Sequence, residues 1–414
     1  MQYSAHLPVN RSMVTPRLGP RPLPFHLMMA MNLYMSSNAA LPLLRNGSLN
    51  WSPKLEKAGE KILGALRSQR TEGFAARVER LSRERLSAFM KGVQVYLDHP
   101  YRRELEDPPV VWTKGSTRLL DYGDAERTRP VIVIPSLINR HYILDLSEER
   151  SFVRWLAGEG FRPFVVDWGT PSQSERSFSI GDYVKRLDHV LGWVADATDC
   201  PSVSVIGYCM GGMLAMGMSL RNAAKIDNLV LLATPWNFHN VGLAYANAMA
   251  TLYSALEPSI KLVDEMPPEV LQICFSALDP LLVERKFVSF SEKDPGTPDA
   301  HAFVAVEDWV NDGVPLVASV ARECVYDWYG SNSPAKGEWM VDGCAVNPAF
   351  FNKPALVVVP ANDRIVPPDS AIALGESLPQ VTFLEPAAGH VGMVVGRSAE
   401  KTVWKPVAEW LSTP

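Results

Sequence analysis

The segment Val203-Ser-Val-Ile-Gly-Tyr-Cys-Met-Gly-Gly-Met213 joins a buried strand directly to a helix through a tight corner that carries Cys209. Strand and helix backbones crowd at such a corner, so glycine is needed on both sides of its tip. Gly207, Gly211 and Gly212 meet this need. The pattern is that of a nucleophile elbow with a thiol in place of the usual serine hydroxyl. A thiol there suits acyl chemistry on thioesters. We therefore expect covalent catalysis, with acyl transfer favoured over hydrolysis.

Eight short apolar runs lie along the chain after residue 105, and helical patterns separate most of the later ones. The runs are continuous, not alternating, which indicates strands buried on both faces of a mostly parallel sheet. We therefore predict an α/β-hydrolase fold, with a mostly parallel eight-stranded sheet and flanking helices. The expected strands are 110–112, 117–122, 131–135, 164–168, 203–208, 229–234, 355–360 and 381–385. The expected helices between them are 146–158, 181–197, 210–221, 370–378 and 400–411.

The sequence predicts three regions. Residues 1–105 are an N-terminal helical region, in which Ser52-Pro53 caps one helix and 74–96 form another. Residues 106–235 and 350–414 form the catalytic core. Residues 236–349 are longer than a crossover needs and rich in aromatic and helical segments, which indicates an inserted, mainly helical cap over the active site.

Composition excludes several classes of function. The 414 residues carry a net charge of −5 and give no basic footprint, so we expect no nucleic-acid partner. The five cysteines are odd in number and scattered without metal-ligand spacing, which favours a reducing compartment, no structural disulfide and no metal site. No nucleotide or flavin fingerprint is present, so no bound cofactor is expected.

The stretch 22–44 is uncharged and mostly apolar. Its polar residues and the prolines that bound it make it a poor match for a transmembrane segment. We interpret it as an amphipathic helix docked on the catalytic body. An interfacial anchor is the alternative, since it would suit a protein that works at an apolar surface.

Chain order supplies partners for the thiol. In this fold an acid follows a later strand, and a histidine lies in the loop after the last one. Asp363 comes just after the strand 355–360, and His390 lies in a small-residue loop after 381–385. We predict that His390 takes the proton of Cys209, and that Asp363 orients the imidazole and stabilises its charged form.

The oxyanion hole is expected from backbone amides. One is the N–H of Met210, and the other belongs to the turn after the strand 131–135, where Leu137 and Ile138 are both candidates. Trp236 and His239, near the end of the strand 229–234, are possible substrate contacts, although an aromatic at a strand end is more often a packing residue.

At these residues the chain resembles the polyhydroxyalkanoate (PHA) synthases, whose lipase-like box carries Cys in place of Ser. Gly207-Tyr-Cys-Met-Gly-Gly212 is similar to that box. Pro135-Ser-Leu-Ile-Asn-Arg-His-Tyr-Ile-Leu-Asp-Leu146 resembles their P-x-x-I-N-x-x-Y-I-L-D-L segment. Gly389-His-Val-Gly-Met393 and Glu307-Asp-Trp-Val-Asn-Asp-Gly313 look like two further motifs of the family, the second from its cap region.

The resemblance implies that Cys209 is acylated by a 3-hydroxyacyl-CoA thioester, which is a substrate and not a cofactor, and that repeated transfer grows a polyester. Asp363 would also assist the incoming hydroxyl. It further implies a homodimer, an accessory synthase subunit in the shorter members, and a cytoplasmic location at the surface of polyester granules.

Two departures from the family leave other outcomes open. The turn reads Pro-Ser-Leu where synthases commonly carry Pro-Pro-Trp, and Thr234-Pro-Trp-Asn-Phe238 lacks the acidic residue that many carry before Phe. A Cys-nucleophile thioesterase or polyester hydrolase on the same fold is one alternative. A non-catalytic granule-associated protein is the second.

Overall fold

The computed structural model describes residues 16–53, 55–68, 73–124 and 129–413. The chain forms two compact units. One combines Met1–Pro100 with Val283–Val304, and the other combines Tyr101–Leu282 with Ala305–Pro414.

The second unit is built on an eight-stranded sheet in the order β1-β2-β4-β3-β5-β6-β11-β12. The strands from β4 to β12 pair in parallel, while β1 and β2 are antiparallel at one edge. All eight predicted strands are present, and the predicted α/β-hydrolase fold is confirmed. Their bounds are Val110–Lys114, Thr117–Asp121, Pro130–Ile134, Arg162–Asp167, Val203–Tyr208, Ile226–Leu232, Ala355–Val358 and Val381–Leu384.

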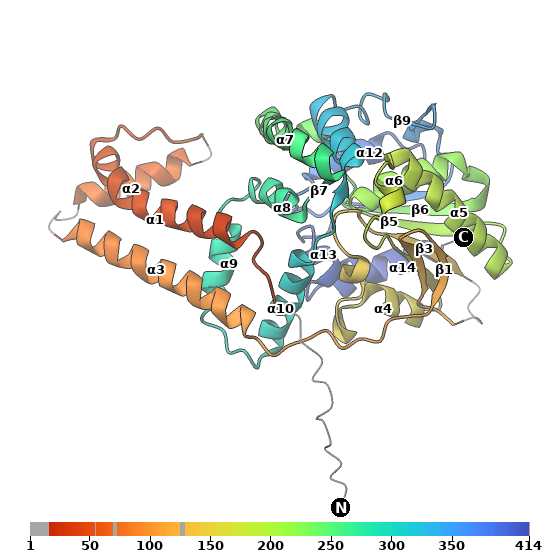
Figure 1. Cartoon of the computed structure of the whole chain (residues 1–414), viewed down its shortest axis with the longest axis horizontal. Helices are drawn as coiled ribbons and strands as arrows, with labels where there is room; N and C mark the ends of the chain where they lie inside the picture. Colours follow the sequence, from red (N-terminus) through yellow and green to blue (C-terminus); the bar gives the residue numbers. More distant parts are fainter. Residues whose placement is uncertain (1–15, 54, 69–72, 125–128, 414) are drawn as a thin grey trace, which may run out of the picture. The chain divides into compact units, whose positions relative to one another are not determined.

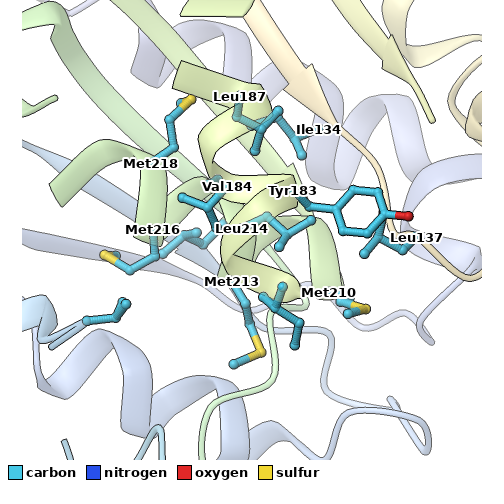
Figure 2. Packing of buried hydrophobic residues seen from close by; sticks show 14 of the residues in the cluster. Ile134, Leu137, Tyr183, Val184, Leu187, Met210, Met213, Leu214, Met216 and Met218 are labelled. Carbon is cyan, nitrogen blue, oxygen red and sulfur yellow. The ribbon is translucent and has the colours of Figure 1, made fainter. Parts of the chain in front are cut away.

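Both faces of the sheet are covered, which explains the continuous apolar strands. On one face lie α5 (Ile180–Thr198), α6 (Met210–Arg221) and α12 (Pro368–Glu376). On the other lie α4 (Phe152–Gly158) and α14 (Lys405–Leu411) (Figure 1). Figure 2 shows how side chains of α6 pack beside those of α5, including Val184 and Leu187. The helix that follows the corner is therefore buried and fixed in place.

Two predicted helix starts are wrong. Helix α4 begins at Phe152 and not at residue 146, because Ser151 pairs with Asp145 in an isolated bridge and caps the helix by accepting the Arg154 N–H. Helix α2 (Glu56–Ser68) begins after the expected Ser52-Pro53 cap. The predicted helix 400–411 starts as a π-helix (Glu400–Trp404) before α14.

The chain between β6 and β11 adds no strand to the large sheet. It forms α7 (Leu243–Val263), α8 (Pro268–Ser276), α9 (Leu282–Phe290), α10 (Pro298–Asn311), α11 (Ala318–Arg322) and a π-helix (Glu323–Gly330). It also forms two small antiparallel pairs, β7 (Glu265–Met266) with β8 (Leu316–Val317) and β9 (Met340–Val341) with β10 (Cys344–Ala345). The sequence predicts that this interval is a cap, which stays a prediction, and Val283–Val304 within it belongs to the first unit.

In the first unit, α1 (Leu23–Asn46) and α3 (Phe74–Leu97) lie side by side (Figure 1). Tyr34 donates to Glu284 of α9, and Arg85 Nε lies 3.0 Å from the same carboxylate. A side chain at Gly92 would collide with the backbone of Phe287. These contacts explain why part of the inserted interval groups with the N-terminal helices. No helix within the described ranges is both long enough and apolar enough to cross a membrane.

Candidate active site

The corner between β5 and α6 has the geometry that its glycines predict. Cys209 has a φ of 55°, in the left-handed region that a residue with a side chain rarely adopts. A Cβ at Gly207 would collide with Gly212, and a Cβ at Gly212 would collide with Thr234. A Cβ at Gly211 would collide with the carbonyls that end β3. Close packing on three sides therefore holds Cys209 in its strained turn at the carboxyl edge of the sheet.

His390 connects Cys209 to Asp363. Its Nδ1 lies 2.6 Å from Oδ2 of Asp363, whose side chain is fully buried. The other carboxylate oxygen accepts the backbone N–H groups of Ile365 and Val366 at 2.8 and 2.9 Å. Burial alone would lower the pKa of His390, but the charges of Cys209 and Asp363 and hydrogen bonds to both raise it well above its ordinary value. The structure thus brings the three predicted catalytic side chains together.

Tyr208 is a neighbour of this group that the sequence analysis did not identify. Its ring stacks on the imidazole of His390, with centroids 5.3 Å apart and planes 29° apart. Its hydroxyl donates to the backbone carbonyl of His390 at 3.3 Å. Tyr208 is itself buried, so the ring contacts of His390 are fixed on one face. The residue was visible in the elbow motif, but nothing in the sequence shows which way its ring turns.

The two candidate turn amides differ in their hydrogen bonds. The N–H of Ile138 donates to Oγ of Ser136 at 3.2 Å. The N–H groups of Leu137 and Met210 make no hydrogen bond to other described residues. Because the Cβ position of Gly211 abuts the end of β3, the turn and the elbow are neighbours. Of the two turn candidates, Ile138 thus already has a partner for its N–H, whereas Leu137 does not, and the prediction of an oxyanion hole is compatible with the N–H groups of Leu137 and Met210.

The two predicted substrate contacts, Trp236 and His239, make their hydrogen bonds and ring contacts with residues other than Cys209, His390 and Asp363. Trp236 is 2% exposed and packs edge-to-face on Trp339, as a core residue does. His239 forms a ring hydrogen bond at 3.1 Å with the carbonyl of Gly330. Among the described residues, neither side chain hydrogen-bonds or stacks with the catalytic three. A third histidine, His141, has its Nδ1 3.2 Å from a carboxylate oxygen of Asp167.

A buried carboxylate behind the turn was also missed. Asp145 has a fully buried side chain that accepts from Ser151 at 2.6 Å, from Arg154 at 2.7 Å and from Arg103 and Tyr122 at 3.0 and 3.1 Å. Burial raises the pKa of Asp145, but hydrogen bonds from Arg154 and Ser151 and the charges of both arginines lower it overall. It anchors the end of the segment whose sequence matched P-x-x-I-N-x-x-Y-I-L-D-L.

The second unit also has a cavity away from Cys209. A cavity of about 600 Å³ opens at the amino ends of β3, β5 and β6, the edge opposite Cys209. Its lining includes Arg129, Phe161, Asn228 and Trp410, none of which the sequence marked. Within the described ranges, no group of three or more acidic, His or Cys side chains is arranged to hold a metal ion.

Comparison with known proteins identifies the class first. The sequence model of the alpha/beta hydrolase fold family matches residues 129–396. The chain belongs to the alpha/beta hydrolase fold family. A solved lipase-esterase related protein from Clostridium acetobutylicum aligns with a TM-score of 0.43 and 14% identity over 72% of this chain and 98% of its own.

Within that class the chain is PhaC-like, and the resemblance to PHA synthases is confirmed. It is 29% identical to the poly(3-hydroxyalkanoate) polymerase subunit PhaC of Haloferax mediterranei over 73% of this chain and 63% of that relative. It is 27% identical to the PhaC subunit of Allochromatium vinosum over 68% of this chain and 80% of that one. The chain thus spans less than two thirds of the Haloferax protein and most of the Allochromatium one.

Proposed function

We propose that the chain is a PHA synthase-type acyltransferase that moves 3-hydroxyacyl groups from CoA thioesters into a polyester. The observation that carries the proposal is His390, which bonds a buried carboxylate through Nδ1 and lies against a thiol at a nucleophile elbow. The PhaC relatives supply the substrate class, since their names state a poly(3-hydroxyalkanoate) polymerase.

The first half-reaction follows from the geometry. With Nδ1 bonded to Asp363, the Nε2 atom of His390 is left to take the proton of Cys209. The thiolate then attacks the thioester carbonyl carbon, and the negative oxygen is stabilised by the amides of Leu137 and Met210. When the intermediate collapses, the carbon–sulfur bond to CoA breaks and CoA leaves with the proton from His390. A 3-hydroxyacyl group remains on Cys209.

The second half-reaction needs a hydroxyl as the next nucleophile. The hydroxyl of another 3-hydroxyacyl group gives its proton to His390, and its oxygen attacks the acyl carbon on Cys209. The new ester bond forms as the carbon–sulfur bond breaks, and Cys209 takes back the proton. Asp363 stabilises the imidazolium in both halves. If water takes the place of the hydroxyl, the same residues make a thioesterase.

One assay separates these outcomes. Purified protein is supplied with 3-hydroxybutyryl-CoA, and free CoA, polymer and free acid are measured, with Cys209→Ala as control. CoA release together with polymer supports the synthase. CoA release with only free acid would favour the thioesterase or polyester hydrolase. Equal behaviour of wild type and Cys209→Ala would favour the non-catalytic granule-associated protein.

The assembly and the cell compartment follow from the same proposal. We expect a homodimer, in the cytoplasm and at the surface of polyester granules, and an accessory subunit that raises its activity, because the relatives are named as polymerase subunits. Light scattering of the purified protein tests the dimer, and co-sedimentation with polyester granules tests the location. A monomer, or protein that stays in the supernatant, would contradict these expectations.

A further inference from the structure

The turn that carries the Leu137 amide is held from outside by one short segment. This segment, Trp309–Val314, consists of the last three residues of α10 and the three residues after it. The indole N–H of Trp309 donates to the carbonyl of Arg140 at 2.8 Å. The N–H of Val314 donates to the carbonyl of Ile138 at 3.1 Å, and Gly313 pairs with Asn139 in an isolated antiparallel bridge.

Side chains add to these backbone contacts. The hydroxyl of Tyr142 donates to Oδ2 of Asp312 at 3.1 Å, and Nε of Arg140 lies 3.6 Å from Oδ1 of the same carboxylate. Trp309 is 7% exposed and packs with the core on the α4 face of the sheet. The turn thus meets, residue after residue, a segment that lies about 170 positions later in the chain.

The other long-range contacts of the turn are mostly made by side chains: Leu137 is buried in the core, and the Arg140 guanidinium donates to Thr170 at 3.2 Å. The turn follows the last residue of β3, so no ladder bond to a neighbouring strand continues past Ile134. Inside the turn Ile138 donates to Ser136, and on the near side the indole of Trp168 donates to Pro135. The carbonyls of Ile138 and Arg140 both accept from Trp309–Val314. The orientation of the peptide units beyond Leu137 therefore depends on this segment.

We propose that Trp309 and Asp312 are positioning residues that hold the turn so that the Leu137 amide faces the acyl carbon on Cys209. This rests on the proposed function, in which that amide stabilises the oxyanion. An oxyanion donor must lie 2.7–3.1 Å from the developing charge, so a small shift of the turn is costly. The segment lies in the interval between β6 and β11. Displacing it removes the hydrogen-bond donors of the Ile138 and Arg140 carbonyls, which releases the turn and disables the oxyanion hole.

Two reactions of the same thiol separate this role from a general structural one. Acylation passes through a tetrahedral oxyanion and needs the two amides. Alkylation by iodoacetamide is a displacement at a saturated carbon, so it reports thiolate formation and access without an oxyanion hole. A variant that only loosens the fold or misplaces His390 changes both rates, whereas loss of the turn slows acylation alone.

The test compares Trp309→Phe with Trp328→Phe. Both tryptophans are buried in the second unit, but among the described residues the indole N–H of Trp328 has no hydrogen-bond partner. Acylation of Cys209 by 3-hydroxybutyryl-CoA and by p-nitrophenyl acetate is followed by mass. Alkylation of Cys209 by iodoacetamide is followed in parallel. We expect Trp309→Phe to slow both acylations at least tenfold and to change alkylation less than twofold. Trp328→Phe leaves the ratio of acylation to alkylation at the wild-type value.

The inference is overturned if Trp309→Phe keeps the wild-type ratio, whether both rates stay or both fall. Tyr142→Phe, which removes one hydroxyl at the protein surface, keeps the test available if Trp309→Phe does not fold, and it should lower the same ratio two- to fivefold. An unchanged ratio in Tyr142→Phe would then count against the inference. Failure of wild type to react with 3-hydroxybutyryl-CoA, while p-nitrophenyl acetate still acylates Cys209, would sink the proposed substrate and leave the positioning role standing.

Discussion

Asp363 offers a prediction in which the effects on rate and on stability separate. Asp363→Asn keeps an oxygen for the N–H groups of Ile365 and Val366, which lie 2.8 and 2.9 Å from Oδ1. It loses one charge-assisted hydrogen bond, the 2.6 Å contact with His390. Such a bond contributes about 1.5–3 kcal/mol. If that energy acts in the acylation step, acylation of Cys209 slows by about 10-fold to 150-fold.

Asp363→Ala removes the same bond and also leaves the half-buried N–H of Ile365 and the buried N–H of Val366 without a partner. Each N–H group left without a partner costs about 1–3 kcal/mol, so the free energy of unfolding falls by about 2–6 kcal/mol more than in Asp363→Asn. Single-turnover acylation measures the rate, and urea denaturation measures the stability. Because Asp363 raises the pKa of His390, both variants should also lower the pKa of the imidazole, which NMR of its ring protons reports.

A wild-type rate of acylation in Asp363→Asn over the whole pH range would contradict the expected role of the hydrogen bond to His390. Equal stability of Asp363→Ala and Asp363→Asn would contradict the expected contribution of the two backbone N–H groups.

Variants at three further positions give independent tests. Tyr208→Phe keeps the stack on His390 and loses one neutral hydrogen bond of about 1 kcal/mol, so acylation slows by about fivefold or less, and Tyr208→Leu, which also loses the stack, is slower. Burial raises the pKa of Glu323 to about 7 despite the N–H of Ile180, so the folded chain holds an extra proton between about pH 4.5 and 7, and wild type loses stability as pH rises through that window. Glu323→Gln should abolish this slope and be more stable above pH 7 by about 1–3 kcal/mol in urea titrations. Asp145→Asn leaves two arginines facing a neutral amide and should cost about 3–5 kcal/mol of unfolding free energy, and a loss below 1 kcal/mol would contradict the buried ion-pair interpretation.

The sheet could be predicted because its strands are local signals. Each of the eight strands is a short apolar run bounded by turn residues, and the order of Cys209, Asp363 and His390 along the chain matches the fold. Helix ends were predicted less closely, because they depend on contacts that sequence patterns do not show. The start of α4 is set by Ser151, which pairs with Asp145, and the start at residue 146 was wrong for that reason.

The contacts that support the site could not be predicted, since they join distant segments. Trp309 reaches a carbonyl 169 positions away, and Tyr208 stacks on a residue 182 positions away. The π-helix Glu323–Gly330 and the grouping of Val283–Val304 with the N-terminal helices are likewise products of packing. The motifs that contain Asp145 and Trp309 were visible in the sequence, but their roles appear only when the partners are placed.

The most direct test of the central claim is the mass of the protein after brief mixing with 3-hydroxybutyryl-CoA. We predict an adduct of one or more 3-hydroxybutyryl groups on the peptide that contains Cys209, formed as CoA is released and followed by polymer. The adduct should be absent in Cys209→Ala and slow to form in His390→Ala. An adduct on another residue, or one that His390→Ala forms at the wild-type rate, would contradict the account.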